Sequence, residues 1–200
     1  MLKKIGIFGG TFNPVHNGHL RIAEAAVREV GLSKVVFMPN GNPPHKSSDG
    51  IIAPNHRYNM VLEAIKYNPS FDISDYEIKR TKPSYTIDTY RVMREKYDCS
   101  IYFIIGADSF YTLNKWKSYD NLVTECNFIV ADRNCPEGSD LPAACRRYRE
   151  LGGNVELLKC EPYDVTSTDL RNLVAKNKDI SGYVPEAVRD YIFSNKLYQS

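Results

Sequence analysis

The feature that most constrains the fold of this chain is its alternation of short apolar, β-branched runs with longer stretches of helical periodicity. Short runs rich in Ile, Val and Phe are typical of strands that are buried on both faces. We expect strands at residues 3–8, 35–38, 101–105, 128–131 and 155–158, with a more polar one at 71–79. Apolar residues spaced along one helical face predict helices at residues 20–30, 54–67, 87–97, 141–151, 167–175 and 185–194.

Strands that alternate with helices predict a parallel sheet covered on both faces, because each crossover returns the chain over the sheet. The predicted class is therefore α/β, with a doubly wound parallel sheet. The length fits one domain, residues 1–200, with a helical C-terminal portion from about residue 165. Sheets of this kind bind ligands beyond the carboxyl ends of their strands. We therefore expect the site just after residues 8, 38, 105 and 158.

Composition argues against several classes of function. The net charge of +2 offers no basic face for nucleic acid, so any anion site must be local. No apolar stretch approaches the roughly 20 residues of a membrane span, and the N-terminal apolar run is too short for a signal peptide. The five cysteines include no CxxC pair, which favours packed, reduced thiols over disulfides or zinc. We expect a cytoplasmic protein without nucleic-acid or membrane partners.

The segment Gly-Gly-Thr-Phe-Asn-Pro-Val-His-Asn-Gly-His, residues 9–19, follows the first predicted strand and leads into a helix. Glycines let a ligand approach the backbone, and the start of the helix favours an anion. His16 and His19 are three residues apart, so on a helical turn they share one face and can donate to phosphate oxygens. A structural role in capping the helix and a metal site are the alternatives, although zinc would need a third ligand that this segment lacks.

Charged residues follow the other predicted strands as well. After residues 35–38, consecutive prolines stiffen an arm that ends in His-Lys, which presents Lys46 to a phosphate. Asp108 follows the strand at 101–105 and suits ribose hydroxyls, with capping of a helix as the alternative. Near the C-terminus, Arg171 lies at a helix start with hydroxyl groups, which makes an anion site unless it is only a surface charge.

Two further segments carry groups that could contact a ligand, although the residues alone favour a plain helix cap for the first of them. Ser84 or Thr86 can cap the helix that follows, and free amides at its start could receive a carboxylate. A plain helix cap is the alternative. Trp116 is the only tryptophan, and its polar neighbours predict partial exposure, which suits stacking on a ring, although a sole tryptophan is often in the core.

These motifs together resemble a known superfamily. The sequence His-Asn-Gly-His at residues 16–19 is similar to the HxGH signature of the nucleotidylyltransferases, which class I aminoacyl-tRNA synthetases share. Pro-Pro-His-Lys at 43–46 and Ser-Tyr-Thr-Ile-Asp-Thr at 84–89 resemble the bacterial nicotinate mononucleotide adenylyltransferases in particular. Ile-Gly-x-Asp at 105–108 matches the same family, as do Ser167, Thr168 and Arg171, although Thr166 and Leu170 replace a Ser and an Ile of its motif. The resemblance covers essentially the whole chain.

The resemblance implies a Rossmann-like fold and a site for ATP and nicotinate mononucleotide. Mg²⁺ would travel on the ATP phosphates, without a metal site built from protein ligands. The expected catalytic residues are His16, His19, Lys46 and Arg171. The expected ATP-binding residues are Gly9, Gly10, Thr11, Phe12, His16, His19, Gly106, Asp108, Ser167, Thr168 and Arg171. The expected mononucleotide-binding residues are Thr11, Lys46, Tyr85, Thr86, Trp116 and Lys117.

The expected reaction is adenylyl transfer from ATP to nicotinate mononucleotide, which gives deamido-NAD and pyrophosphate. Two alternatives stay open: a related transferase for phosphopantetheine or a cytidylyl acceptor, and a module that binds a dinucleotide without chemistry. Asn13 departs from the bacterial family, which usually has Asp there. The preference between nicotinate and nicotinamide mononucleotide also stays open. Residues 133–160 match no motif and are the candidates for contacts in a homo-oligomer.

Overall fold

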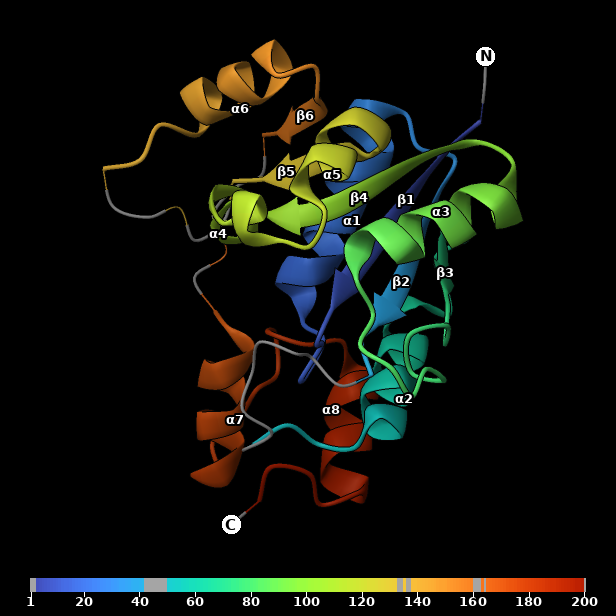
Figure 1. Ribbon diagram of the computed structural model, residues 1–200. Coiled ribbons are helices and arrows are strands. Elements are labelled where there is room, and N and C mark those ends of the chain that lie inside the picture. The colour runs from blue at the N-terminus through green and yellow to red at the C-terminus, as the bar shows by residue number, and fades with distance from the viewer. Residues whose placement is uncertain are drawn as a thin grey trace.

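The computed structural model describes residues 3–41, 50–132, 135, 138–159, 163 and 165–199. Within this part of the chain, six strands form one sheet in the order β3-β2-β1-β4-β5-β6, and all neighbouring pairs are parallel. The expected Rossmann-like α/β fold is confirmed (Figure 1). The strands are β1 (Lys4–Gly10), β2 (Lys34–Pro39), β3 (Phe71–Ile73), β4 (Ser100–Gly106), β5 (Asn127–Ala131) and β6 (Asn154–Leu158).

Helices cover both faces of the sheet, as predicted. One hydrophobic cluster includes residues of α1 (Asn17–Val30), α2 (Pro54–Ile65), α7 (Ser167–Ala175) and α8 (Glu186–Ser194). A second cluster includes residues of α3 (Thr86–Tyr97), α4 (Ala107–Tyr111), α5 (Tyr119–Glu125) and α6 (Leu141–Glu150), and η1 (Leu113–Lys115) lies between α4 and α5. Figure 1 shows α2, α7 and α8 grouped at the end of the molecule where the C-terminus is marked.

The order in which the chain adds strands to the sheet reverses next to β1. The chain passes from β1 through α1 to β2 on one side and later adds β4 on the other side. Gly10 is in register with Pro39, and Phe8 is in register with Ile104. The carboxyl ends of β1, β2 and β4 therefore lie close to one level of the sheet. Such a switch point opens a crevice where folds of this kind bind their ligands.

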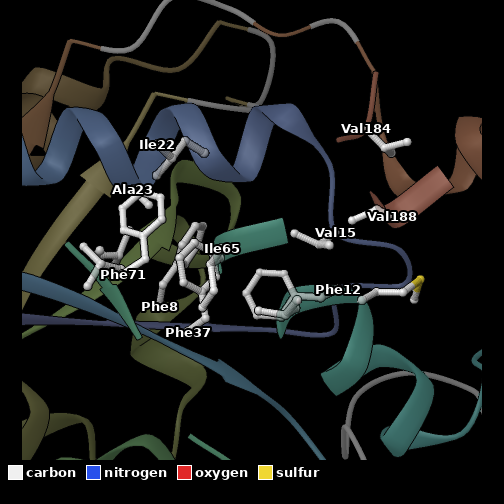
Figure 2. Packing of buried hydrophobic residues seen from close by; sticks show 14 of the residues in the cluster. Phe8, Phe12, Val15, Ile22, Ala23, Phe37, Ile65, Phe71, Val184 and Val188 are labelled. Atoms are coloured by element: carbon white, nitrogen blue, oxygen red, sulfur yellow. The ribbon is translucent and has the colours of Figure 1, made fainter. Parts of the chain in front are cut away.

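The hydrophobic cluster on the α1 face joins the loop after β1 to the C-terminal segment. The rings of Phe8, Phe12 and Phe37 have centroids 5.5–5.7 Å apart. Figure 2 shows these rings below α1, with Val184 and Val188 of the C-terminal segment at one end of the group. Because all five side chains are buried, the loop and the C-terminal helices are held by one core.

Some element boundaries differ from the sequence prediction. The strand expected at 71–79 ends at Ile73, because the chain then turns and the N–H of Lys79 donates to Asp75 O at 3.0 Å. The first helix begins at Asn17, earlier than the expected residue 20. The sequence pattern did not predict α4 or α5, because helices of five and seven residues are too short to show periodicity.

None of the described helices is long and apolar enough to cross a bilayer. The four described cysteines are free thiols. Cys126 and Cys145 are buried as expected, whereas Cys99 and Cys135 are half-buried, so the prediction of packed cysteines holds for only two of them.

Candidate functional site

A buried aromatic ring holds the loop after β1 in an unusual backbone conformation. Phe12 has a φ of 48°, in the left-handed region that bulky residues rarely adopt. Its side chain is only 2% exposed and lies edge-on to Phe8 and His19, at centroid distances of 5.6 and 5.1 Å. Packing of the ring therefore offsets the backbone strain. Gly10 makes room for it, because a Cβ there would lie 2.9 Å from Phe12 Cζ.

His16 and His19 lie side by side at the start of α1. Their ring centroids are 3.8 Å apart, and the side chains are only 1% and 9% exposed. His16 is the N-cap residue, and its backbone N–H donates to Nδ1 of His19 at 3.2 Å. A neutral imidazole that accepts at Nδ1 carries its hydrogen on Nε2. The capping role that the sequence left open is thus present, and it makes Nε2–H the donor of the His19 ring.

Tyr163, which follows β6, packs on the histidine pair. Its ring is nearly parallel to that of His16, at an interplanar angle of 12° and a centroid distance of 5.9 Å. Arg21 lies over the same tyrosine ring, with Cζ 4.9 Å from the centroid. A Cβ on Gly18 would lie 2.7 Å from Tyr163 Cδ1, so the glycine of the HxGH motif permits this close approach.

Arg57 is fully buried and connects the loops that follow β1 and β2. Its Nη1 donates to Thr11 O at 2.8 Å and to Asn40 Oδ1 at 3.2 Å. Its Nη2 donates to the carbonyl oxygens of Asn40 and Gly41 at 2.6 and 2.8 Å, and Nε donates to Ile52 O at 3.2 Å. Burial lowers the pKa of Arg57 from a very high ordinary value, so the guanidinium stays charged at neutral pH.

Asn13 forms a second buried network in the same loop and is only 4% exposed. Its Nδ2 donates to Gly50 O at 2.8 Å, and its Oδ1 accepts from Tyr198 Oη at 2.9 Å and from the N–H of Ile52 at 3.4 Å. An Asp carboxylate could accept the last two bonds, but it would place an acceptor against the Gly50 carbonyl. The departure from the usual Asp therefore adds a hydrogen bond that only an amide can make.

The start of α7 lies against this loop, as the sequence predicted. Ser167 Oγ donates to Pro14 O at 2.9 Å. Arg171 is half-buried; its Nη1 donates to Asn13 O at 2.9 Å and its Nη2 to Thr168 Oγ1 at 3.2 Å. Two nitrogens of the guanidinium thus fix its plane next to the loop that presents the histidines, so a cation from the C-terminal part of the chain joins the site.

Gly106 and Asp108 lie at the end of β4, next to β1. Because Phe8 pairs with Ile104, Gly106 lies level with Gly10 on the adjacent strand. Gly106 is the N-cap of α4, and Asp108 is exposed in its first turn. An exposed carboxylate at this strand end can accept hydrogen bonds from hydroxyl groups of a ligand, as expected for ribose.

The segment expected to bind the pyridine ring forms the start of α3 and the residues after η1. Tyr85 is the N-cap of α3 and no side chain caps the helix, so the expected cap by Ser84 or Thr86 is wrong. Lys117 Nζ lies 4.1 Å from the centroid of the Tyr85 ring and 3.6 Å from Asp88 Oδ2. The structure thus brings Lys117 to the start of α3, where no side chain of the described residues caps the first amides of the helix.

Trp116, which follows η1, is half-buried and packs against the cluster that contains α3 and α4. This is the partial exposure that its polar neighbours predicted. An indole with one side in the core and part of its surface open can present a fixed aromatic face.

Glu77 connects α3 with the loop after β2. Its Oε1 accepts from Thr89 Oγ1 at 2.9 Å, and a Cβ on Gly41 would lie 2.6 Å from its carbonyl oxygen. Burial raises the pKa of Glu77, against the opposing effects of Thr89 and Arg80. Because Arg57 binds both Gly41 and the loop after β1, a continuous series of contacts links that loop to α3.

Most of the predicted site residues therefore come from segments at the carboxyl end of the sheet. Lys46 lies outside the described residues. Gly9 is exposed, and apart from its chain neighbours no heavy atom of the described residues lies within 4 Å of the position of a Cβ on it, so the backbone there has room for a ligand. The described residues hold no group of three or more His, Cys, Asp or Glu that could bind a metal ion.

Comparison with known proteins places the chain in a family. Residues 7–173 match the family model described as cytidylyltransferase-like. A Clostridium acetobutylicum protein named as a probable nicotinate-nucleotide adenylyltransferase is 42% identical over 200 residues, which cover 98% of this chain and 100% of that protein. A Thermoanaerobacter protein of the same name is 41% identical, over 98% of this chain and 94% of its own. This chain belongs to the nicotinate-nucleotide adenylyltransferase family.

Solved structures with the same fold carry related names. Nicotinic acid mononucleotide adenylyltransferase of Plasmodium falciparum complexed with NaAD has a TM-score of 0.79 at 21% identity, over 98% of this chain and 97% of that chain. The same enzyme complexed with APC has a TM-score of 0.77 at 20% identity. At such identities the likeness shows the fold, while membership of the nicotinate-nucleotide adenylyltransferase family follows from the closer curated relatives.

The sequence analysis missed three residues of the site. Arg57 had a signal, because it lies at helical spacing with Val61 and Ile65 and so interrupts the apolar stripe of α2 with a charge. Tyr163 follows the strand end at residue 158, one of the four places where the site was expected. Tyr198 had no signal, because nothing local relates it to Asn13.

Proposed function

We propose that this member of the nicotinate-nucleotide adenylyltransferase family joins ATP to nicotinate mononucleotide and releases pyrophosphate. The observation that carries the proposal is the convergence of His16, His19 and Arg171 on the loop after β1, at the switch point of the sheet. Two anionic substrates repel each other, so their union requires cations and directed donors where their phosphates meet. The names of the curated relatives support the same reaction.

The mononucleotide phosphate is the nucleophile in this reaction. One of its oxygens attacks the α-phosphorus of ATP, the bond from that phosphorus to the bridging oxygen breaks, and pyrophosphate leaves with the electron pair. No protein nucleophile is needed, so the protein contributes alignment and charge stabilisation. His19 donates through Nε2–H, and Arg171 adds a fixed guanidinium. Lys46, which lies outside the described residues, is proposed as a further cation.

ATP would carry Mg²⁺ on its phosphates. Mg²⁺ prefers oxygen ligands and commonly binds substrate phosphates with one or two carboxylates and several waters. Asp108 is an exposed carboxylate at this end of the sheet, and the other predicted ATP-binding residues offer amides, hydroxyls and cations. This donor set fits a metal that the phosphates themselves hold. Mg²⁺ would neutralise part of the charge on those phosphates.

For the acceptor, we propose that the pyridine ring stacks on Trp116 and that its carboxylate accepts from backbone amides at Thr86 and Lys117. The absence of a side-chain cap on α3 supports this placement, because uncapped first-turn amides and the helix dipole favour a negative charge. The amide of nicotinamide mononucleotide carries no charge. We therefore propose that this site favours nicotinate mononucleotide, with Tyr85 and Thr11 as further mononucleotide-binding residues.

Pyrophosphate release tests the proposal, with ATP, Mg²⁺ and either mononucleotide compared by kcat/KM. We expect a strong preference for nicotinate mononucleotide. Equal or reversed preference would still be consistent with adenylyl transfer. It would exclude the proposed binding of the carboxylate at the start of α3. Pyrophosphate release only with phosphopantetheine or a cytidylyl acceptor would show that the proposed substrate is wrong. Tight dinucleotide binding without turnover would show that the protein does not catalyse the proposed reaction.

His19→Ala tests the assignment of the site. Charge-assisted hydrogen bonds to phosphate contribute roughly 1.5–3 kcal/mol, so kcat/KM should fall by at least ~10-fold. His56→Ala is the matched control, because His56 Nδ1 contacts Tyr191 Oη between α2 and α8 and takes no part in the proposed site. If both variants keep the wild-type kinetics, His19 has no catalytic role.

We also propose a cytoplasmic location, which the free thiols of the described cysteines support. A homo-oligomer with contacts through residues 133–160 is the accompanying proposal for assembly. Light scattering on the purified protein, with and without substitutions in that stretch, tests it.

A further inference from the structure

The C-terminal residues place the hydroxyl group of Tyr198 against the loop after β1. Lys196 and Tyr198 have φ values of 51° and 61°, which residues other than glycine rarely adopt. Leu197 between them is buried in the core, and its N–H donates to Ile192 O at 3.0 Å. In this constrained turn, Tyr198 Oη donates to Asn13 Oδ1 at 2.9 Å, a contact between residues 185 positions apart.

Three groups of the described residues hold the Asn13 amide, and the Tyr198 hydroxyl is one of them. A terminal amide can rotate by half a turn and exchange its oxygen and nitrogen. The Gly50 carbonyl only accepts and the Ile52 N–H only donates, so these two groups select the orientation in which Nδ2 donates to Gly50 O at 2.8 Å. The Tyr198 hydroxyl gives Oδ1 its shorter bond, at 2.9 Å against 3.4 Å from the N–H of Ile52. Without the hydroxyl, Oδ1 would depend on the longer bond, which holds the amide in place less firmly.

The surroundings of Tyr198 match a hydroxyl that donates and does not ionise. Burial raises the pKa of Tyr198 well above its usual range, although Arg171 and Arg57 oppose the shift. These two arginines also bind the backbone of the loop, at Asn13 O and Thr11 O. The hydroxyl therefore lies among the groups that hold the loop in place, and the proposed reaction makes no direct use of it.

We propose that Tyr198 is a positioning residue that acts through Asn13. By fixing the Asn13 amide, it would hold the loop that presents His16 and His19 in place against the segment at Gly50. In the sequence, Gly50 directly follows residues 42–49, which include Lys46. This inference rests on the proposed adenylyl transfer and adds a residue to it. Tyr198 touches neither substrate, and its effect passes through the alignment of the phosphate-binding groups.

Tyr198→Phe removes the hydroxyl and keeps the ring. The matched control is Tyr148→Phe, because Tyr148 is a buried tyrosine of α6 whose Oη donates to Leu122 O at 3.2 Å, away from the site. Both variants lose one buried hydrogen bond, so their melting temperatures should fall by a similar few degrees. Only Tyr198→Phe should lower kcat/KM, by roughly 3- to 10-fold, through both a lower kcat and a higher KM for ATP.

A second readout is the Kd of a non-hydrolysable ATP analogue, which needs no turnover. We expect weaker binding in Tyr198→Phe and unchanged binding in Tyr148→Phe. The route through Asn13 predicts coupling, so Tyr198→Phe should have little further effect in an Asn13→Ala background. If kcat/KM and Kd are unchanged, or if the two substitutions are additive, the positioning role is excluded.

The two proposals fail in distinguishable ways. Wild-type protein that releases no pyrophosphate with either mononucleotide contradicts the proposed function. In that case, weaker analogue binding by Tyr198→Phe would still support the positioning role, and unchanged binding would overturn it. Active wild-type protein with an equally active Tyr198→Phe variant contradicts only the inference about Tyr198.

Discussion

Arg57 shows how one buried charge can organise loops that follow different strands. Its guanidinium donates to four residues that belong to the loop after β1, the loop after β2 and the segment before α2. All of these acceptors are oxygens, and three of its bonds are 2.8 Å or shorter. A planar fork of donors imposes a geometry that a lysine ammonium could not match. The relative position of the two loops therefore depends on this residue.

Arg57→Met should destabilise the protein by at least ~3 kcal/mol, because it leaves several backbone carbonyls without their donor in a buried place. Denaturant unfolding measures this change. Arg91→Met is the matched control, since Arg91 pairs with Glu125 at the surface, where an ion pair contributes about 0–1 kcal/mol. Equal effects of the two substitutions would mean that the Arg57 network contributes little.

Glu77 gives a prediction about pH. Burial raises its pKa above the usual 4.5. The folded protein therefore binds this proton more tightly than the unfolded chain. The associated stability is complete below the unfolded value and is lost as the pH rises through the folded value. Glu77→Gln keeps an acceptor for Thr89 and cannot ionise, so its melting temperature relative to wild type should increase from pH 4 to pH 8.

Glu125→Gln should show the opposite dependence of stability on pH. The hydrogen bond from Arg91 lowers the pKa of Glu125, so the stability from this carboxylate is present above the unfolded value and lost as the pH falls. Glu125→Gln should therefore lose melting temperature relative to wild type at pH 8 and not at low pH. If the Glu77→Gln difference were constant with pH, Glu77 would not titrate in the way that its burial indicates.

At the scale of elements, helix α7 owes its start to a capping box. Thr166 Oγ1 accepts from the N–H of Asp169 at 3.2 Å, and Asp169 Oδ2 accepts from the N–H of Thr166 at 2.9 Å. The same turn carries Ser167 and Arg171, which bind the loop after β1. The local stability of this helix end therefore bears on the position of Arg171, the proposed catalytic cation.

Thr166→Ala should destabilise the protein by about 1 kcal/mol, the usual loss for an N-cap hydroxyl. Because Arg171 lies in the affected turn, kcat/KM should also fall by roughly threefold, equivalent to ~0.6 kcal/mol. Asp140→Ala is the matched control, since Asp140 caps α6 by accepting from the N–H of Ala143 at 2.8 Å. That variant should lose stability with unchanged kcat/KM, and equal kinetic losses would contradict a specific role for α7.

For the whole molecule, one core connects the sheet, the loop after β1 and the C-terminal helices. Phe12 and Ile192 belong to the same hydrophobic cluster although they lie at opposite ends of the chain. Because these parts share one buried core, unfolding the C-terminal helices while the sheet stays folded has a high free-energy cost. The site is assembled from both parts, so its integrity depends on this coupling.

Ile192→Ala should lower the free energy of unfolding by about 2–5 kcal/mol, because it opens a cavity at a fully buried position of α8. Far-UV circular dichroism and Trp116 fluorescence should report one shifted transition, although Trp116 packs in the other cluster. The neighbouring Phe193→Ala, at a position 39% exposed, should cost less than ~1 kcal/mol. A fluorescence transition that stays at the wild-type midpoint would show independent unfolding.

The sequence by itself determined the class of fold and most of the candidate site. Alternating strands and helices leave few arrangements other than a parallel sheet. In a parallel sheet the residues just after each strand meet at one edge, so polar residues such as His16 and Asp108 had to come together there. Local spacing also predicted the contact between the two histidines. These features depend on residues that are close in sequence, so the sequence pattern alone can predict them.

Only the tertiary structure decided which distant groups hold the site in shape. The bonds of Arg57 to Thr11, of Arg171 to Asn13 and of Tyr198 to Asn13 each join residues far apart in sequence. A buried donor must find an acceptor, but the sequence pattern does not say which one. The same limit explains two of the wrong predictions, the long strand at 71–79 and the side-chain cap of α3. Each depended on whether the backbone found a partner in space, and propensity alone does not decide that.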